Sequence, residues 1–205
     1  MTASRPVRNE TLDSIANRHS VRMFTGRLVP DDHITAILRA ANQAPSAHNQ
    51  QSWRFVVVRG EKKKALAHLV TSHAAGFPRP ASTLLRMAAR SIVSAPVVIA
   101  VSNTGELIAR GAELFGVGED SARDFFRTME IQNSAAAVEN MLVAATSLGV
   151  ATVWLGILFL IKDDVLSFLG EPQGEFMAVV PVGYAAYPVA GPRKAPLEQV
   201  VRIVE

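Results

Sequence analysis

The sequence predicts an α+β fold in which helices cover both faces of a sheet. Helical and strand patterns alternate along the 205 residues, without internal repeats or low-complexity linkers. The middle of each strand pattern is a continuous apolar run, which is typical of strands covered on both faces. One long segment in the second half is apolar nearly all round, as expected of a central helix. The length fits one domain spanning residues 1–205.

The helical patterns are amphipathic segments with recognisable starts and ends. The clearest start is Pro30-Asp31-Asp32, which places a cap and acidic side chains at a helix N-terminus, where negative charge is favourable. The basic run Glu61–Lys64 is expected to form the solvated first turn of another helix. The apolar periodicity predicts helices at Thr11–Asn17, Asp31–Gln43, Lys62–His73, Ala81–Ser91, Arg123–Leu148 and Ile161–Leu169.

Strands are expected at Arg54–Arg59, Pro96–Ser102, Ala151–Ile157 and Phe176–Tyr184. The region from Glu139 to Lys162 carries no charge between these two residues and is long enough to span a bilayer. Polar residues interrupt it, and Ser147-Leu148-Gly149 is typical of a helix end with Gly at C′. We therefore expect a buried helix followed by a buried strand, with no membrane partner. The N-terminus lacks the apolar stretch of a signal peptide, which predicts a cytoplasmic protein.

The composition indicates a folded chain with a covered surface. Hydrophobic residues make up 49% of the sequence and charged residues only 19%, which excludes a disordered chain. A solvated monomer usually carries about 25% charged residues, so we expect a partner subunit to cover part of the surface of this chain. The chain has no Cys, which excludes a disulfide framework and a thiol nucleophile.

Charge is uneven along the chain, with 14 Lys and Arg against 5 Asp and Glu in residues 1–102 and 7 against 13 in residues 103–205. This favours an anionic ligand held by the N-terminal half, since Arg binds phosphate through a planar fork of donors. Nucleic acid is not expected, because the basic residues are scattered without interleaved aromatics. His68 and His73 do not have the spacing of a zinc pair, and GxSxG and P-loop motifs are absent. If the protein is an enzyme, a bound cofactor supplies the chemistry.

Two segments carry the main functional signal. Arg18-His19-Ser20-Val21-Arg22 places two guanidinium groups and a hydroxyl on the same side if the segment is extended, where they could hold one anion. The loop from Ala44 to Trp53 (APSAHNQQSW) combines turn residues with amide and hydroxyl groups. Each segment also has a structural interpretation, because Arg–carboxylate pairs and turn caps are common.

Taken together and in this order, the motifs resemble the nitroreductase family of flavin enzymes. They are RHSVRMF, then APSAHNQQSWRFVVV, the expected strand VWLGILF and the C-terminal GPRKAPLEQVV, and together they cover roughly residues 10–204. The resemblance implies an α/β sandwich with a central, mainly antiparallel sheet flanked by helices. It also implies FMN as cofactor and an intertwined homodimer with an active site at each end of the interface.

The resemblance assigns roles to particular residues. Arg18 and Ser20 would hold the FMN phosphate and ribityl chain, His19 would contribute mainly its backbone, and Arg22 would lie at the N1/O2 side of the flavin. The opposite subunit would provide a loop of Pro45, Ser46, Ala47 and Asn49. Leu155 and Gly156 would present backbone N–H groups to flavin N5 and O4, and Arg193, or Lys194 one register away, would contact the phosphate. The sequence departs from the family at His19, where Arg is frequent, and at Ser52, where Pro commonly precedes Trp53.

The function implied is an FMN-dependent oxidoreductase that uses NADH or NADPH. By ping-pong hydride transfer it would reduce a small-molecule electron acceptor, such as a nitroaromatic compound or a quinone, without a catalytic side chain. The alternatives are a flavin-sequestering protein with little turnover and a specialised relative for flavin fragmentation, dehalogenation or deazaflavin maturation. The segments Ser72–Arg90 and Asn103–Phe126 are where the family places its substrate-covering insertions.

Overall fold

A four-stranded antiparallel sheet forms the centre of the computed structural model, which describes residues 7–116 and 118–204. The strand order is β1-β2-β4-β3, and β1 pairs with β2 from Trp53↔Asn103 to Val58↔Val98. The strands are β1 (Trp53–Val58), β2 (Val97–Asn103), β3 (Ala151–Thr152) and β4 (Glu175–Gly183). The predicted α+β class and antiparallel sheet are confirmed.

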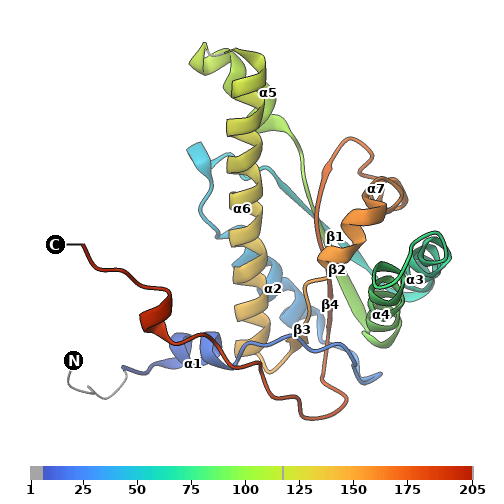
Figure 1. The fold of residues 1–205 in the computed structure, drawn as a ribbon. Coiled ribbons are helices and arrows are strands. Elements are labelled where there is room, and N and C mark those ends of the chain that lie inside the picture. Colours follow the sequence, from blue (N-terminus) through green and yellow to red (C-terminus); the bar gives the residue numbers. More distant parts are fainter. Residues whose placement is uncertain (1–6, 117, 205) are drawn as a thin grey trace.

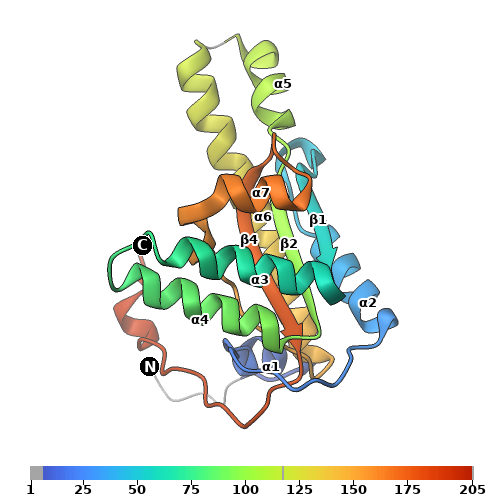
Figure 2. The same ribbon diagram turned by 90° about the vertical axis from the view of Figure 1, so that its right-hand side faces the viewer.

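Alternate residues of β2 enter two separate cores, because successive strand side chains point to opposite faces. Val98 and Ala100 pack with the layer of α3, α4 and α7, whereas Val97, Ile99 and Val101 pack with α2 and α6. The two layers lie on opposite sides of the sheet (Figures 1 and 2). Their helices are α2 (Asp31–Asn42), α3 (Gly60–Ala74), α4 (Ala81–Ser94), α6 (Glu119–Ser147) and α7 (Lys162–Leu169).

The long helix α6 is the predicted central helix. It ends at Ser147, and Gly149 has the left-handed φ of +67° expected at a helix C-terminus. Its N-terminal part extends beyond the sheet and packs against α5 (Glu106–Phe115), and we call residues 106–132 the arm (Figure 2). The arm overlaps the second predicted substrate-covering segment, Asn103–Phe126, of which Val117 lies outside the described residues.

Three details differ from the sequence predictions. The expected strand Ala151–Ile157 ends at Thr152, and Gly156–Ile161 forms the 3₁₀ helix η2, whose three-residue spacing buries both Leu158 and Ile161 in the core. Helix α5 was not predicted.

Lys63 is not solvated: its Nζ donates to the carbonyls of Val93 (2.8 Å) and Ala95, next to the end of α4. Burial lowers the pKa of Lys63, and neighbouring Lys64 lowers it further.

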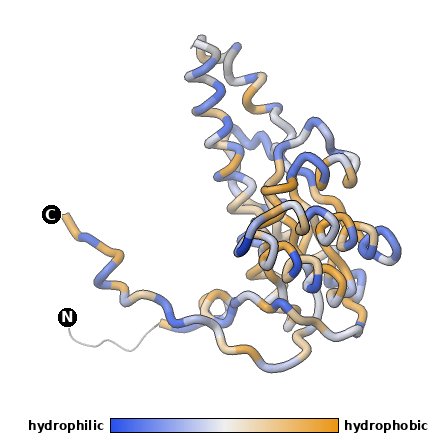
Figure 3. Tube along the Cα trace, turned by 45° about the vertical axis from the view of Figure 1, so that its right-hand side comes forward, coloured by the Kyte–Doolittle hydropathy of each residue, from blue (hydrophilic) through white to orange (hydrophobic). Residues whose placement is uncertain are grey.

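Two terminal segments leave apolar side chains uncovered. Helix α1 (Glu10–Asn17) contains no buried residue. The C-terminal segment, residues 185–204, is mostly irregular and starts against the body, where the Ala186 N–H donates to the Met23 carbonyl at 3.0 Å. Its end, which contains the short 3₁₀ helix η3 (Leu197–Gln199), runs away from the body (Figures 1 and 3). Its large apolar residues are 51–80% exposed: Tyr187, Leu197, Val200, Val201, Ile203 and Val204. No helix among the described residues is long and apolar enough to cross a membrane.

Candidate functional site

The Arg18–Arg22 segment is extended along the edge of the sheet. Ser20 forms a parallel bridge with Thr152, and the Val21 N–H donates to the Thr152 carbonyl at 2.9 Å. Val21 is buried and Arg22 is exposed, as expected for alternating side chains. This arrangement fits the predicted common face for residues 18, 20 and 22. The Arg18 Nε lies 3.4 Å from the carboxylate of Glu139 on α6, so this guanidinium is also held by an ion pair.

Arg22, Leu155 and Gly156 line one cavity of about 160 Å³. Residues of α4 complete its wall, and Ser91 of that helix donates its hydroxyl to the Arg22 carbonyl at 2.9 Å. The fold thus brings together two predicted segments that are more than 130 residues apart in the sequence.

The predicted role of Leu155 needs a correction. Its N–H donates to the carbonyl of Val179 on β4 at 2.9 Å, so this donor is already used inside the protein. Gly156 is the first residue of η2, and the first N–H groups of a helix have no partner within it. Of the two predicted backbone donors, Gly156 therefore has the geometry to bind a ligand, and Leu155 contributes to the wall of the cavity.

The C-terminal segment passes close to the Arg18–Arg22 segment. A Cβ added to Gly191 would lie 3.2 Å from the Cβ of His19, a spacing tight enough to favour glycine there. Arg193 and Lys194 follow within three residues, and both are exposed. The predicted return of the GPRK motif to the N-terminal motif agrees with this close approach.

The loop between α2 and β1 has an unusual backbone. His48, Asn49 and Gln51 have φ values of +52°, +53° and +50°, which non-glycine residues adopt at an energetic cost. The Ser46 hydroxyl accepts the Gln51 N–H at 3.1 Å, and an α6 side chain accepts the Ala47 N–H. Strained backbone of this kind concentrates at functional sites.

The loop does not meet the Arg22 cavity within one chain, since neither Pro45, Ser46, Ala47 nor Asn49 lines that cavity. The loop contacts α6 at Asn133, whereas Arg18 contacts it at Glu139. Six residues separate these positions by about 9 Å along the helix and about 120° around it.

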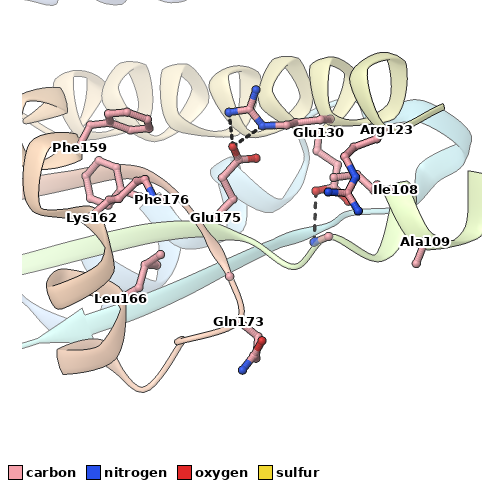
Figure 4. Close-up of a pocket in the computed structure, with 13 residues that line it drawn as sticks. Ile108, Ala109, Arg123, Glu130, Phe159, Lys162, Leu166, Gln173, Glu175 and Phe176 are labelled. Carbon is pink, nitrogen blue, oxygen red and sulfur yellow. Dashed lines mark hydrogen bonds and ion pairs between the residues drawn. The ribbon is translucent and has the colours of Figure 1, made fainter. Parts of the chain in front are cut away.

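A larger cavity, of about 610 Å³, lies elsewhere, between the arm, η2, α7 and the start of β4 (Figure 4). Phe159 and Phe176 provide an apolar wall, and Arg127 of α6 pairs with Glu175 through Nε at 2.7 Å. None of the predicted cofactor-binding residues lines this cavity. Volume alone would therefore give a different site from the one that the sequence motifs predict.

Glu130 lies beneath this cavity and is completely buried (Figure 4). Its carboxylate accepts the N–H groups of Leu107 at 2.8 Å and Gly105 at 3.2 Å, at the start of α5. Burial raises the pKa of Glu130 above its usual range; the two N–H donors oppose the rise and the Glu175 carboxylate adds to it. Sequence reasoning missed Glu130 because nothing in its local spacing indicates a partner in another helix.

Comparisons with known proteins agree with this fold and these motifs. The nitroreductase family matches residues 15–184. An Archaeoglobus fulgidus protein with the provisional name NADH dehydrogenase/NAD(P)H nitroreductase is 30% identical over 148 residues, covering 72% of this chain and 68% of that protein. A Thermus thermophilus protein named NADH dehydrogenase is 28% identical over 219 residues, covering 98% of each chain. The structure of a Bacteroides fragilis nitroreductase with bound FMN has a TM-score of 0.74 and 25% identity, covering 97% of this chain and 100% of that one.

The sheet and its two helical layers are thus a nitroreductase fold. Because the family match extends over most of its length, the chain belongs to the nitroreductase family of oxidoreductases. The resemblance carried by the sequence motifs is confirmed.

Proposed function

We propose that the protein is an FMN-dependent oxidoreductase that uses NADH or NADPH to reduce nitroaromatic compounds, quinones or similar electron-poor molecules. The observation that carries this proposal is the cavity shared by Arg22 and Gly156, which lies beside an extended Arg-x-Ser-x-Arg segment in a nitroreductase fold. The bound FMN of the Bacteroides fragilis structure and the names of the curated relatives support the cofactor and the electron donor.

The residues of the extended segment next to Arg22 suit the phosphate end of FMN. Arg18 and Ser20 would bind the phosphate and ribityl chain, with the Arg18 guanidinium oriented by its ion pair to Glu139. His19 would contribute its backbone, because its ring Nδ1 lies 2.7 Å from the carbonyl of Asn17. Arg193, or Lys194, would add a cation from the C-terminal segment that approaches His19.

The residues that line the cavity suit the flavin ring. FMN, when bound, accepts a hydride from the nicotinamide and delivers electrons to the acceptor. Arg22 would place its guanidinium at the N1/O2 side, where a positive charge stabilises the negative charge that develops on reduction. The Gly156 N–H would fix the ring near N5 and O4. Hydride transfer needs no side-chain acid, so these groups bind and orient while water supplies protons.

A second copy of the chain would complete the site. A ligand of this size usually occupies about 300–1,000 Å³, more than the roughly 160 Å³ that one chain encloses around Arg22. The strained loop of Pro45, Ser46, Ala47 and Asn49 does not line this cavity in its own chain. We propose that it reaches the FMN of the partner subunit in an intertwined homodimer. The exposed apolar side chains of α1 and of the C-terminal segment support such an interface.

FMN titration followed by anaerobic stopped-flow mixing with NADH and with NADPH tests the proposal. We expect a yellow protein whose flavin absorbance bleaches rapidly with at least one nucleotide. Arg22→Ala should weaken FMN binding, whereas the control Arg39→Ala, on the exposed side of α2, should not. A protein that takes up no FMN would contradict the cofactor assignment. Bound flavin that neither nucleotide bleaches would favour a sequestering protein or a specialised member with another donor.

A further inference from the structure

Helix α6 presents three polar side chains to the protein interior where β2 ends. Glu130, Asn133 and Ser134 are 0%, 8% and 0% exposed. Burying polar groups is unfavourable unless they form hydrogen bonds, so their partners indicate what these residues do. Ser134 donates to Asn103, the last residue of β2, and Glu130 accepts the first N–H groups of α5. These two side chains tie α6 to the sheet and to the arm.

Asn133 makes a different contact. Its Oδ1 accepts the N–H of Ala47 at 3.2 Å, across 86 positions in the sequence. Its Nδ2 is buried and has no hydrogen-bond partner among the described residues. An unpaired buried donor is destabilising, so an apolar residue of similar size would suit this position better if packing were its only role. The acceptor facing Ala47 is therefore the feature that distinguishes Asn at this position.

Ala47 begins the strained part of the loop. This residue immediately precedes His48 and Asn49, whose φ values are positive. Such backbone persists only where surrounding contacts hold it. The hydrogen bond that Asn133 accepts fixes the loop at Ala47. The hydrogen bond from the Gln51 N–H to the Ser46 hydroxyl joins the two sides of the loop.

The loop also packs directly against the arm. The rings of His48 and Phe115 lie 5.9 Å apart, and Ala47 packs against the buried pair Leu107 and Phe126. The loop therefore rests on the arm through apolar contacts, but the Asn133 bond is the direct polar link from α6 to the loop backbone.

We infer that Asn133 is a positioning residue for the flavin site: by accepting the Ala47 N–H it holds the loop of residues 45–49 in the conformation that meets FMN. Asn133 acts through the loop backbone and does not itself touch the cofactor. The inference rests on the proposed function, because it requires the loop to be part of the FMN site.

Asn133→Leu removes the acceptor at nearly constant size, whereas Asn133→Asp keeps an oxygen in its place. Asn140→Leu is a matched control on the same helix, because Asn140 lies about 10 Å further along α6 and donates to the Ala40 carbonyl of α2 at 3.2 Å. The dissociation constant of FMN, from quenching of flavin fluorescence, is measured beside the melting temperature of each FMN-free protein. Asn133→Leu should weaken FMN binding roughly tenfold, as expected from one lost hydrogen bond to a buried group. Asn133→Asp should recover most of the affinity, and Asn140→Leu should stay within about twofold of wild type at a comparable loss of melting temperature.

A merely structural role would lower the melting temperature of both Leu variants and leave FMN affinity equal in them, and that result overturns the inference. If Asn133→Leu does not fold, Asn133→Ser, whose hydroxyl is too short to reach Ala47, replaces it with the same expected loss. Wild-type protein that binds no FMN would instead contradict the proposed function itself. Wild-type binding with unchanged affinity in the Asn133 variants leaves the proposed function standing and rejects only the positioning role.

Discussion

Strand β2 and the end of the C-terminal segment are both short and apolar, yet their environments are opposite. Every residue of β2 is buried, whereas Leu197, Val200 and Ile203 are each at least 65% exposed. Strand β2 is therefore covered within one chain. A second group of apolar residues, which includes those on α1 and the C-terminal segment, stays exposed in one chain. Exposed apolar surface of this extent is typical of an interface.

Deleting residues 196–205 should have the largest effect. Fully burying a Val, Leu or Ile side chain contributes about 1.5–3 kcal/mol, so losing several such residues should weaken dimer association by at least about two orders of magnitude. The body should still fold, because β2 and both cores lie outside the deleted segment. Sedimentation velocity and far-UV circular dichroism measure the two expectations. A truncated chain that still sediments as two copies would show that the interface lies elsewhere.

Ile99→Ala and Ile203→Ala compare the two regions directly. Ile99 is fully buried in β2, so its truncation should lower the free energy of unfolding by about 2–5 kcal/mol. Ile203 is 65% exposed in one chain, so its truncation should leave monomer folding unchanged and weaken only association. Denaturant unfolding at two protein concentrations separates the effects, because only association depends on concentration. A large, concentration-independent loss in Ile203→Ala would contradict the comparison.

Gly111→Ala should disturb the packing of the arm. A Cβ at this position would overlap the ring of Phe126, so the two arm helices must move apart. We expect a loss of about 1–3 kcal/mol from overpacking, reduced by the better helix propensity of Ala. Gly26→Ala is the control, because nothing lies within 4 Å of the added Cβ. Thermal unfolding of both variants measures the difference, and equal stability would mean that α5 and α6 are not closely packed.

Glu130→Gln should have the smallest effect and a distinct pH dependence. Because burial raises the pKa of Glu130 in the folded protein, the folded state binds its proton more tightly than the unfolded state. Protonated Glu130 therefore stabilises the folded state below the pKa that it has in the unfolded chain. This stabilisation is lost as the pH rises through the pKa of Glu130 in the folded protein. The melting temperature of wild type relative to Glu130→Gln should therefore fall as the pH rises from about 4 to 7. A constant difference across this range would contradict a raised pKa.

The sequence predicts the fold well where apolar periodicity is unambiguous. Helix α6 and its end at Ser147, just before Gly149, follow directly from local pattern and cap chemistry. The run around Gly156 is different, because a short continuous apolar run fits a strand and a buried helical turn equally well. In the fold this run forms η2, which places both Leu158 and Ile161 in the same core. The burial of Lys63 was equally unpredictable, since its acceptors lie at the end of another helix.

The candidate site, like the fold, has parts that the sequence predicts and parts that it does not. The alternation of Arg18, Ser20 and Arg22 is local, and it predicted a shared face that agrees with the extended backbone. Asn133 and Glu130 accept backbone N–H groups far away in the sequence, and the residues around a polar side chain in a helix do not identify its partner. The sequence also could not show that the Leu155 N–H donates to the carbonyl of Val179.

The central claim is that FMN binds a site completed by two chains, and sedimentation velocity of the FMN-loaded protein tests it most directly. The sample is diluted across the range in which dimer and monomer coexist, and the visible absorbance of FMN is followed together with the protein absorbance. We expect all bound FMN to sediment with the two-chain species and to be released as that species dissociates. FMN that sediments with the single chain would contradict the claim.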